Sequence, residues 1–358
     1  MRTDGKIHGC GRLAYNWLVI AFSGADMRTL IVLLSLLLGA GLAQAQERVI
    51  VDVDYVQDAA RRGAIIWDVR SPADYKKGHI PGAINIGDVA RVLRDENTED
   101  FIAIEKIEKI FSAAGLDPAR EIIAYGSRGT WNPYFARFTM QSFGGGQTRV
   151  YHDGMDGWIA SGMRPATDES KLVPLDLKLR ADSGASVSTR EVIARLNQRG
   201  IQIVDARTPG EFAGEDIRAI RGGHIPGAVN IPYEQNWVDP DTPGKLARRQ
   251  VTETSGMALK PVEQLRALYA RLDPEKETIV YCQSGVRASE TAGVLQQLGF
   301  RNVKVYDSSW LGYGNTLDAP ANNVTFFNVG LMNSRIRVLQ GRIEQLEREL
   351  GAAKAEKK

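Results

Sequence analysis

The chain is poor in cysteine, histidine and surplus charge. Its 358 residues include two cysteines and four histidines, and the formal net charge is +2. So few thiols exclude a disulfide framework. No pair of these residues has metal-ligand spacing, so neither a metal nor another cofactor is predicted. The balanced charge lacks the basic excess of nucleic-acid-binding proteins.

The remaining composition is that of an ordinary soluble globular protein. Hydrophobic residues make up 43% of the chain and charged residues 25%, which are typical fractions. A chain of this length accommodates roughly two domains.

The N-terminal residues 1–45 read as a signal-peptide region. From Met27 the sequence is MRTLIVLLSLLLGAGLAQAQE, with a basic Arg28, an apolar run over 30–38 and a small-x-small site ending at Ala45. This order is typical of a secretory leader, and the run is short for a membrane span. We therefore predict a start at Met27, cleavage after Ala45 and export, in a bacterium to the periplasm; an uncleaved anchor is the alternative.

Cleavage at that site would also remove Cys10 and leave Cys282 as the single thiol of a nearly neutral chain. A lone thiol in an oxidising compartment must be buried or used.

The rest of the chain contains a long internal repeat. IIWDVRSPADYKKGHIPGAINI (65–86) matches IQIVDARTPGEFAGEDIRAIRGGHIPGAVNI (201–231), which has eight extra residues before its histidine. Downstream, 122–154 and 279–309 share the layout strand, tight loop, helix, glycine turn, strand. Alternating strands and helices predict α/β domains with parallel sheets covered on both faces. A repeat of this length indicates a duplicated domain.

The predicted domains are 47–165 and 187–318. They are joined by a linker over 166–186, which mixes charge with Pro, Ser and Gly. The triple glycine at 144–146 follows a predicted helix, so it reads as a turn and not as a phosphate-binding loop.

Four motifs stand out in the chain: Asp-x-Arg followed by GHIPGA, both present twice, then YCQSGVR and VYDSSW. In these motifs the chain resembles the tandem rhodanese-like sulfurtransferases (thiosulfate/3-mercaptopyruvate sulfurtransferase family). The resemblance covers the chain to about residue 318. It implies two doubly wound α/β domains, with an active cysteine on the loop after a central strand of the second. Gly126 stands where the first copy would carry that cysteine.

The loop chemistry also follows from the residues themselves. ETIVYC reads as a buried strand that ends at Cys282, and a helix is expected about five residues later. A loop curling there gathers backbone N–H groups beside a helix N-terminus, and Arg287 adds a full positive charge. Such surroundings stabilise a thiolate, a persulfide or a bound anion. The alternative for Cys282 is an inert, buried small hydrophobe.

The predicted site centres on Cys282 as nucleophile. The substrate-binding candidates are Gln283, Ser284, Gly285, Val286 and Arg287. Asp205 and Arg207, like Asp68 and Arg70, are predicted to tie loops together by charge-assisted hydrogen bonds, with Arg207 as an alternative pocket residue.

The histidines are not assigned to catalysis. His79 and His224 occur in both copies, including the copy without a cysteine, so they read as structural. His152 is expected at the surface.

The predicted reaction is transfer of a sulfane sulfur from thiosulfate through a Cys282 persulfide to cyanide or a thiol. The familiar thiosulfate and 3-mercaptopyruvate enzymes of this family carry a substrate-binding arginine where this chain has Glu211. Their cysteine loops tend to end in threonine where this chain has Arg287. These departures leave the identity of the donor open, with thiosulfate as the first choice and 3-mercaptopyruvate as the second.

A non-catalytic sulfur carrier or binding module is one alternative function. A phosphatase is another, although those relatives have five residues between Cys and Arg and this loop has four.

Beyond residue 318 a helix is predicted over 328–354. Its apolar residues alternate in steps of three and four, which is a heptad a/d stripe: Val329, Met332, Ile336, Leu339, Ile343, Leu346 and Leu350. With Ile343 at position a, Arg342 and Glu347 form an opposite-charge pair across a parallel dimer. We predict a homodimer or partner contact through 329–350; the alternative is a helix lying on its own domain.

The first copy is predicted to be a catalytically inactive scaffold. It has Gly126 at the cysteine position and Trp131 at the position of Arg287. Its expected role is to wall off the Cys282 pocket from solvent.

Overall fold

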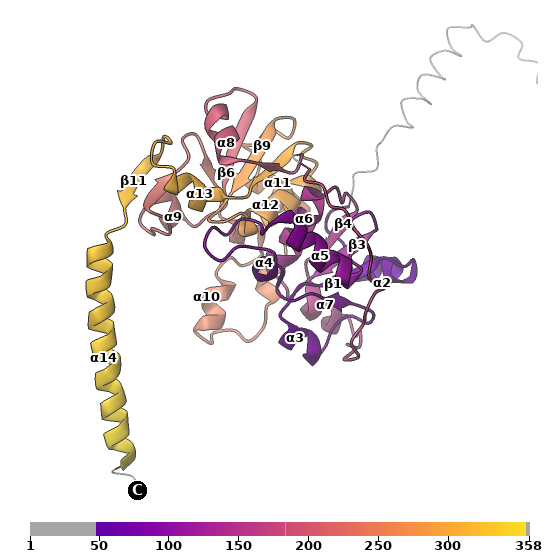
Figure 1. The fold of residues 1–358 in the computed structure, drawn as a ribbon, viewed down its shortest axis with the longest axis horizontal. Helices are drawn as coiled ribbons and strands as arrows, with labels where there is room; N and C mark the ends of the chain where they lie inside the picture. Colours follow the sequence, from indigo (N-terminus) through magenta and orange to yellow (C-terminus); the bar gives the residue numbers. More distant parts are fainter. Residues whose placement is uncertain (1–47, 183, 356–358) are drawn as a thin grey trace, which may run out of the picture. The chain divides into compact units, whose positions relative to one another are not determined.

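The computed structural model describes residues 48–182 and 184–355. The predicted signal peptide, its cleavage site and Cys10 lie outside these residues. The elements of the first α/β domain are (Figure 1) α2 (Val53–Arg61), β1 (Ile65–Asp68), α3 (Pro72–Lys77), β2 (Ile84–Asn85), α4 (Val89–Val92), α5 (Ile104–Ala114), β3 (Ile122–Tyr125), α6 (Asn132–Ser142), β4 (Thr148–Tyr151) and α7 (Gly154–Ala160).

The second α/β domain repeats this arrangement with additions. Its elements are β5 (Ser186–Val187), α8 (Thr189–Arg195), β6 (Ile201–Asp205), α9 (Pro209–Ala213), β7 (Arg221–His224), β8 (Val229–Asn230), the 3-10 helix η2 (Tyr233–Asn236), α10 (Thr242–Ala247), the 3-10 helix η3 (Ser255–Met257), α11 (Val262–Leu268), β9 (Glu277–Tyr281), α12 (Val286–Gln297), β10 (Val303–Tyr306) and α13 (Ser309–Asn315). Strand β11 (Asn322–Phe326) and helix α14 (Val329–Ala355) follow.

The main sheet of each domain is parallel, as the repeat predicts. The strand order is β2-β1-β3-β4 in the first domain and β5-β10-β9-β6-β8 in the second. Central strands are buried on both faces because successive side chains point to opposite sides. In β1, for example, Ile65 and Trp67 belong to one core cluster and Ile66 to another. The predicted fold class, two doubly wound domains and a C-terminal helix, is confirmed.

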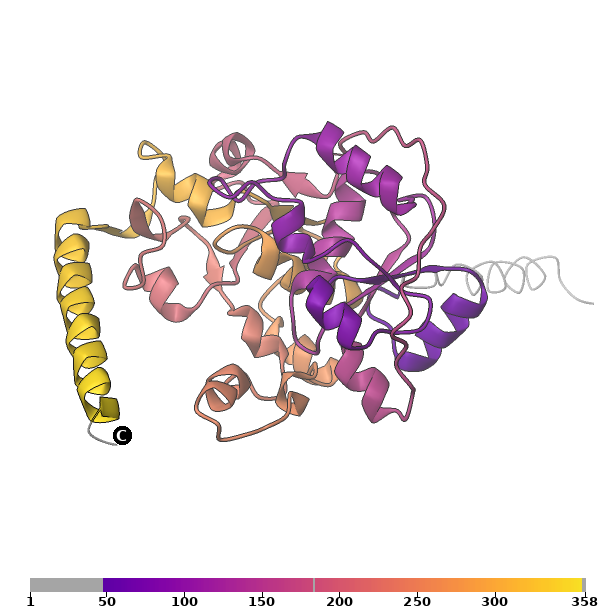
Figure 2. The same cartoon turned by 60° about the horizontal axis from the view of Figure 1, so that its bottom comes forward.

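One core cluster continues from the first domain into the second through α6 and α12, which lie side by side in Figures 1 and 2. Gly293 of α12 permits this approach, since a Cβ there would come within 2.7 Å of the Tyr134 ring on α6. In addition, Gln297 of α12 accepts hydrogen bonds from the N–H groups of Val49 and Ile50.

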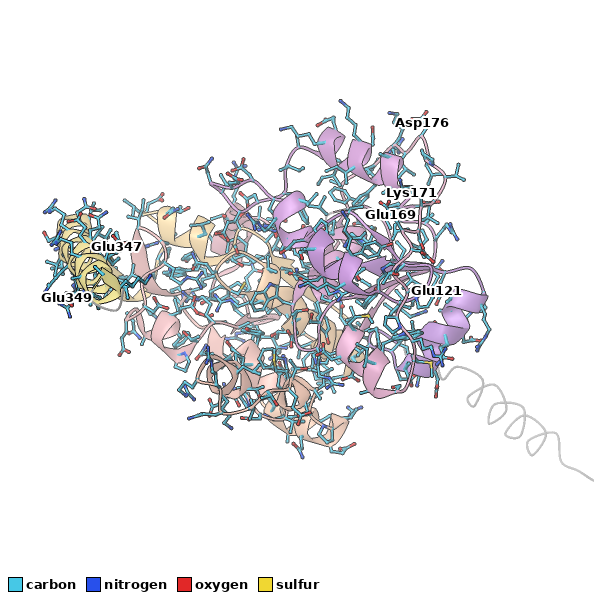
Figure 3. All side chains as sticks on the ribbon, turned by 90° about the horizontal axis from the view of Figure 1, so that it is seen from below. Glu121, Glu169, Lys171, Asp176, Glu347 and Glu349 are labelled. Atoms are coloured by element: carbon cyan, nitrogen blue, oxygen red, sulfur yellow. The ribbon has the colours of Figure 1, made fainter. Side chains whose placement is uncertain are left out.

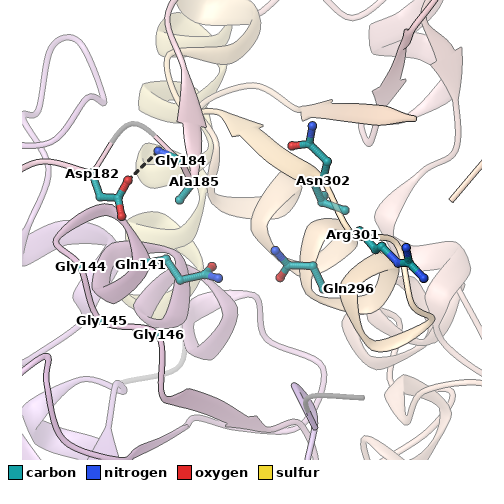
Figure 4. A pocket seen from close by; sticks show the side chains of 11 residues that line it. Gln141, Gly144, Gly145, Gly146, Asp182, Gly184, Ala185, Gln296, Arg301 and Asn302 are labelled. Atoms are coloured by element: carbon teal, nitrogen blue, oxygen red, sulfur yellow. Dashed lines mark hydrogen bonds between the residues drawn. The ribbon is translucent and has the colours of Figure 1, made fainter. Parts of the chain in front are cut away.

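The triple glycine forms a turn after α6, and together with second-domain residues such as Gln296 and Arg301 it lines a pocket of about 280 Å³. Figure 4 shows Gln141 and Gln296 on its opposite sides, and Asp182 accepting a hydrogen bond from the Gly184 N–H. No helix begins at these glycines, so the structure agrees with a turn.

Helix α14 runs for 27 residues and buries none of them. It follows β11, which pairs antiparallel with β7. Figure 3 shows its side chains, including Glu347 and Glu349, spread around the helix. In the described structure α14 therefore buries no face against its own domain. None of the described helices has the length and apolar composition of a membrane span.

Candidate active site

Cys282 begins the loop between β9 and α12. It lies one residue beyond the end of the strand, where the sequence predicts the last strand residue, and α12 begins four residues after it, close to the predicted distance of about five. Gly285 precedes the helix with φ of +78°. A Cβ there would lie 2.6 Å from a carboxylate oxygen of Asp307, so this tight turn requires glycine.

Two backbone carbonyls of this loop accept hydrogen bonds from helix α13. The Cys282 and Gln283 carbonyls accept the N–H groups of Trp310 and Leu311, in the first turn of α13, at 3.0 and 2.9 Å. In a trans peptide unit the N–H points opposite to the C=O. The N–H groups of Gln283 and Ser284 therefore face away from α13.

Five backbone donors are left available. No acceptor in the described chain binds the N–H groups of Gln283, Ser284, Val286, Arg287 and Ala288. Unpaired N–H groups at the start of a helix form an anion-binding site. The loop can therefore hold a thiolate, a persulfide or a sulfur oxyanion.

Cys282 itself is 1% exposed. Its backbone N–H donates to the Ser309 hydroxyl at 3.1 Å, and the Gly285 N–H donates to the same oxygen at 2.9 Å. Ser309 lies within VYDSSW, and its contact with the cysteine loop is not evident from that motif.

Two predicted binding residues are held by contacts outside the loop, and their backbone N–H groups remain unbound in the described chain. The Gln283 amide donates to the Arg218 carbonyl at 2.6 Å, so this side chain anchors the loop. Ser284 is held through its carbonyl, which accepts a 2.7 Å hydrogen bond from Arg94. Val286 lines a neighbouring pocket of about 490 Å³ together with Arg94.

Arg287 is paired. Its two terminal nitrogens each donate to a carboxylate oxygen of Glu211 at 2.8 Å. Although burial opposes ionisation, this pairing lowers the pKa of Glu211 to about 2. Burial also opposes the charge of Arg287, but Glu211 and the nearby Cys282 together raise the pKa of its guanidinium. Arg287, which the sequence suggested as a positive charge for anion binding, is thus paired with Glu211. This pairing could not be predicted from the sequence.

The first domain reaches the loop through Arg94. Besides Ser284, its guanidinium binds Asp307 at 2.7 Å and lies over the rings of Phe101 and Phe135. Burial raises the pKa of Asp307 despite this cation. Trp131 also meets the second domain, edge-to-face on Tyr233 with ring centroids 5.7 Å apart, and Tyr233 lies beneath Arg287.

A model of the rhodanese-like domain matches residues 52–161 and 188–316. The chain belongs to the rhodanese-like family. The two matches coincide with the two parallel-sheet units, and only the second contains a cysteine on its loop.

Curated relatives carry related names. The thiosulfate sulfurtransferase of Corynebacterium glutamicum is 34% identical over 262 residues, which cover 69% of this chain and 80% of that protein. The sulfur carrier protein TtuD of Thermus thermophilus is 30% identical over 297 residues, covering 78% and 98%. These similarities support sulfurtransferase activity.

Solved structures share the fold. The 3-mercaptopyruvate sulfotransferase SseA of Escherichia coli superposes with a TM-score of 0.60 at 24% identity, covering 74% of this chain and 99% of that one.

Both rhodanese-like domains contain the same buried brace. Arg207 binds the Asp205 carboxylate and the Gly223 carbonyl, and Tyr281, next to Cys282, donates to Asp205. Arg70 binds Asp68 and the Gly78 carbonyl in the same way. These contacts are the loop-tying hydrogen bonds that the sequence predicts, and Arg207 is 1% exposed.

The repeated histidines also have matching environments. His79 stacks on Tyr75 and hydrogen-bonds its carbonyl, and His224 does the same with Phe212. Such contacts suit a structural role in both copies.

The surface position predicted for His152 is wrong. Its ring is buried, with one nitrogen bonded to the Tyr134 hydroxyl and the other to the Met257 carbonyl of the second domain. Burial lowers the pKa of His152. It therefore joins the two domains.

Among residues 48–182 and 184–355, no three His, Cys, Asp or Glu side chains are grouped to hold a metal ion.

Proposed function

We propose that this protein is a thiosulfate sulfurtransferase that works through a Cys282 persulfide. The observation that carries the proposal is the loop itself: a buried cysteine followed by backbone N–H groups that no acceptor within residues 48–182 and 184–355 binds. Donors fixed in advance in a water-poor site stabilise developing negative charge.

In the first half-reaction the Cys282 thiolate attacks the outer sulfur of thiosulfate. The Sγ–S bond forms as the S–S bond of thiosulfate breaks, and sulfite leaves with the bonding electron pair. The product is the persulfide anion Cys–S–S⁻, whose charge the loop N–H groups receive.

In the second half-reaction cyanide or a thiolate attacks the outer sulfur of the persulfide. The new bond to the acceptor forms as the S–S bond breaks, which returns the Cys282 thiolate. The products are thiocyanate, or the persulfide of the acceptor.

Two relatives support different assignments within this chemistry. SseA is named for mercaptopyruvate and TtuD is named a sulfur carrier. Glu211 occupies the position where the familiar enzymes have their substrate-binding arginine, and it neutralises the charge of Arg287. Because neither position offers a free positive charge, we favour an inorganic donor that is held by the backbone N–H groups of the loop. The four-residue spacing between Cys282 and Arg287 disfavours a phosphatase.

Turnover separates the enzyme from a carrier. The full chain should convert thiosulfate and cyanide to thiocyanate repeatedly, and Cys282→Ser should abolish the reaction without changing the circular dichroism spectrum. A chain that takes up one sulfur and does not turn over with any thiol or with cyanide would be a carrier.

We also propose that the mature chain is exported to the bacterial periplasm. The support is the basic, apolar and small-x-small order of residues 27–45. Protein from the envelope fraction should begin at Gln46; a retained Met27 would instead indicate an anchor.

Finally, we propose that α14 pairs with α14 of a second copy in a parallel coiled coil. Every residue of its heptad stripe is exposed, from Val329 to Leu350. Gly330, Gly341 and Gly351 weaken the helix by about 1 kcal/mol each, so an isolated α14 needs a partner to remain helical in water.

The charges favour the parallel arrangement. Positions g and e′ then place Arg342 beside Glu347 and Glu349 beside Lys354 of the second copy, with no like-charge pair. In an antiparallel pair whose apolar stripes are aligned, Arg342 of one helix would instead lie beside Arg342 of the other, and the two positive charges would repel each other.

A further inference from the structure

Ser309 occupies a backbone conformation that serine seldom adopts. Its φ is +48°, in the left-handed region where a Cβ crowds the backbone. The equivalent residue of the first domain is Gly154, with φ of +53°. The shared position is confirmed by a matching hydrogen bond, from Trp310 N–H to the Cys282 carbonyl and from Met155 N–H to the Gly126 carbonyl.

The domain without a cysteine therefore uses the residue that suits this conformation, and the domain with Cys282 does not. A glycine would remove the strain at Ser309. Backbone strain of this kind persists where the strained residue has a function, so the serine side chain must supply something that glycine lacks.

The Ser309 hydroxyl uses its full hydrogen-bonding capacity. It donates to the Tyr306 carbonyl at 2.6 Å and accepts the N–H groups of Cys282 and Gly285 at 3.1 and 2.9 Å. A hydroxyl has one proton and two lone pairs, so no capacity remains. The side chain is completely buried, which excludes competition from water.

These contacts tie both ends of the four-residue loop to one oxygen. With the Cys282 and Gly285 N–H groups bound there, and the Cys282 and Gln283 carbonyls bound by α13, the orientation of the intervening peptide units is determined. The loop of the first domain is fastened differently, by Asp156 accepting from the Arg128 N–H.

We propose that Ser309 is the positioning residue of the sulfur-transfer loop, holding the N–H groups of Gln283 and Ser284 in place for the Cys282 thiolate and persulfide. It touches no substrate and acts through the loop backbone. This role in sulfur transfer rests on the proposed function, but the effect of Ser309 on the loop can be measured without sulfur transfer.

The test compares Ser309→Gly, Ser309→Ala and the matched control Ser142→Ala. Ser142 is buried, and its hydroxyl donates to the Phe138 carbonyl within its own helix. The probe is iodoacetamide, a neutral reagent that reports Cys282 thiolate reactivity whether or not thiosulfate is a substrate. We expect about tenfold slower alkylation in both Ser309 variants and a rate within about twofold of wild type in the control.

Ser309→Gly is the decisive variant because it relieves the strained φ. If the serine only stabilised the fold, Ser309→Gly would alkylate and form persulfide at wild-type rates, and that result would overturn the proposal. With thiosulfate, the proposal predicts a lower rate of persulfide formation at saturating donor and a smaller effect on KM. Absence of persulfide in the wild type would instead overturn the proposed function alone.

Amide hydrogen exchange of the wild-type chain needs no variant. The Cys282 and Gly285 amides should exchange at least about a hundredfold more slowly than those of Gln283 and Ser284. Equal exchange at the four amides would contradict the positioning role.

Discussion

Arg287 and Glu211 form a two-pronged ion pair beneath the cysteine loop, with both N···O distances at 2.8 Å. The carboxylate is 1% exposed and the guanidinium 13%. Arg287 therefore holds the first turn of α12 against α9. Under the proposed function, the backbone N–H groups of the loop bind the anionic donor.

Removing one partner of the Arg287–Glu211 ion pair should lower the free energy of unfolding. Arg287→Ala leaves the Glu211 carboxylate buried without its partner, and we expect a loss of about 3–5 kcal/mol in the free energy of unfolding. Arg301→Ala is the matched control, since its ion pair with Glu275 is exposed and contributes less than about 1 kcal/mol. Urea unfolding measures both, and similar losses in the two variants would contradict the structural role.

Acid should weaken this ion pair in a defined range. The pKa of Glu211 is about 2 in the folded chain against an ordinary value of 4.5. The stability it contributes is fully present above pH 4.5 and is lost as the pH falls toward 2, on the order of 3 kcal/mol in total. Glu211→Gln should lose this acid dependence and Glu275→Gln should keep it. An unchanged acid dependence in Glu211→Gln would show that the carboxylate is not paired as described.

The first domain should tune the loop through Arg94. A lysine cannot reproduce the forked contact to Asp307 and the Ser284 carbonyl. We expect Arg94→Lys to lower kcat/KM for thiosulfate by about tenfold. Arg91→Lys, on the exposed side of α4, should stay within about twofold. If both variants were equally active, the first domain would not support catalysis through this contact.

The C-terminal helix should control assembly. The full chain should sediment as a dimer, and a chain ending at Phe327 as a monomer. Leu339→Lys places a charge on the heptad stripe and should dissociate the dimer, whereas Val338→Lys, one residue off the stripe and equally exposed, should not. A monomeric full chain, or dissociation by Val338→Lys, would contradict the parallel coiled coil.

The fold and the centre of the site could be predicted because their determinants are local. The β-branched run before Cys282, the glycine at 285 and the duplicated GHIPGA place the strand, turn and repeat from short stretches of sequence. The Asp-x-Arg contacts were predicted for the same reason, since Asp205 and Arg207 are two residues apart.

What the sequence could not reveal depends on distant partners. Arg287 meets a residue 76 positions away, and Arg94 reaches Ser284 across 190 positions. His152 is buried in contact with Met257, which lies 105 positions away in the second domain. Ser309 was visible within its motif, but its strained φ and its two loop contacts exist only in three dimensions.

The central claim is that Cys282 carries the sulfur. The most direct test is the intact mass of the full chain after incubation with thiosulfate and removal of the excess. The account predicts a gain of one sulfur atom, located at Cys282 by peptide mapping, lost on addition of cyanide and absent in Cys282→Ser. An unchanged mass, or a sulfur retained by Cys282→Ser, would contradict it.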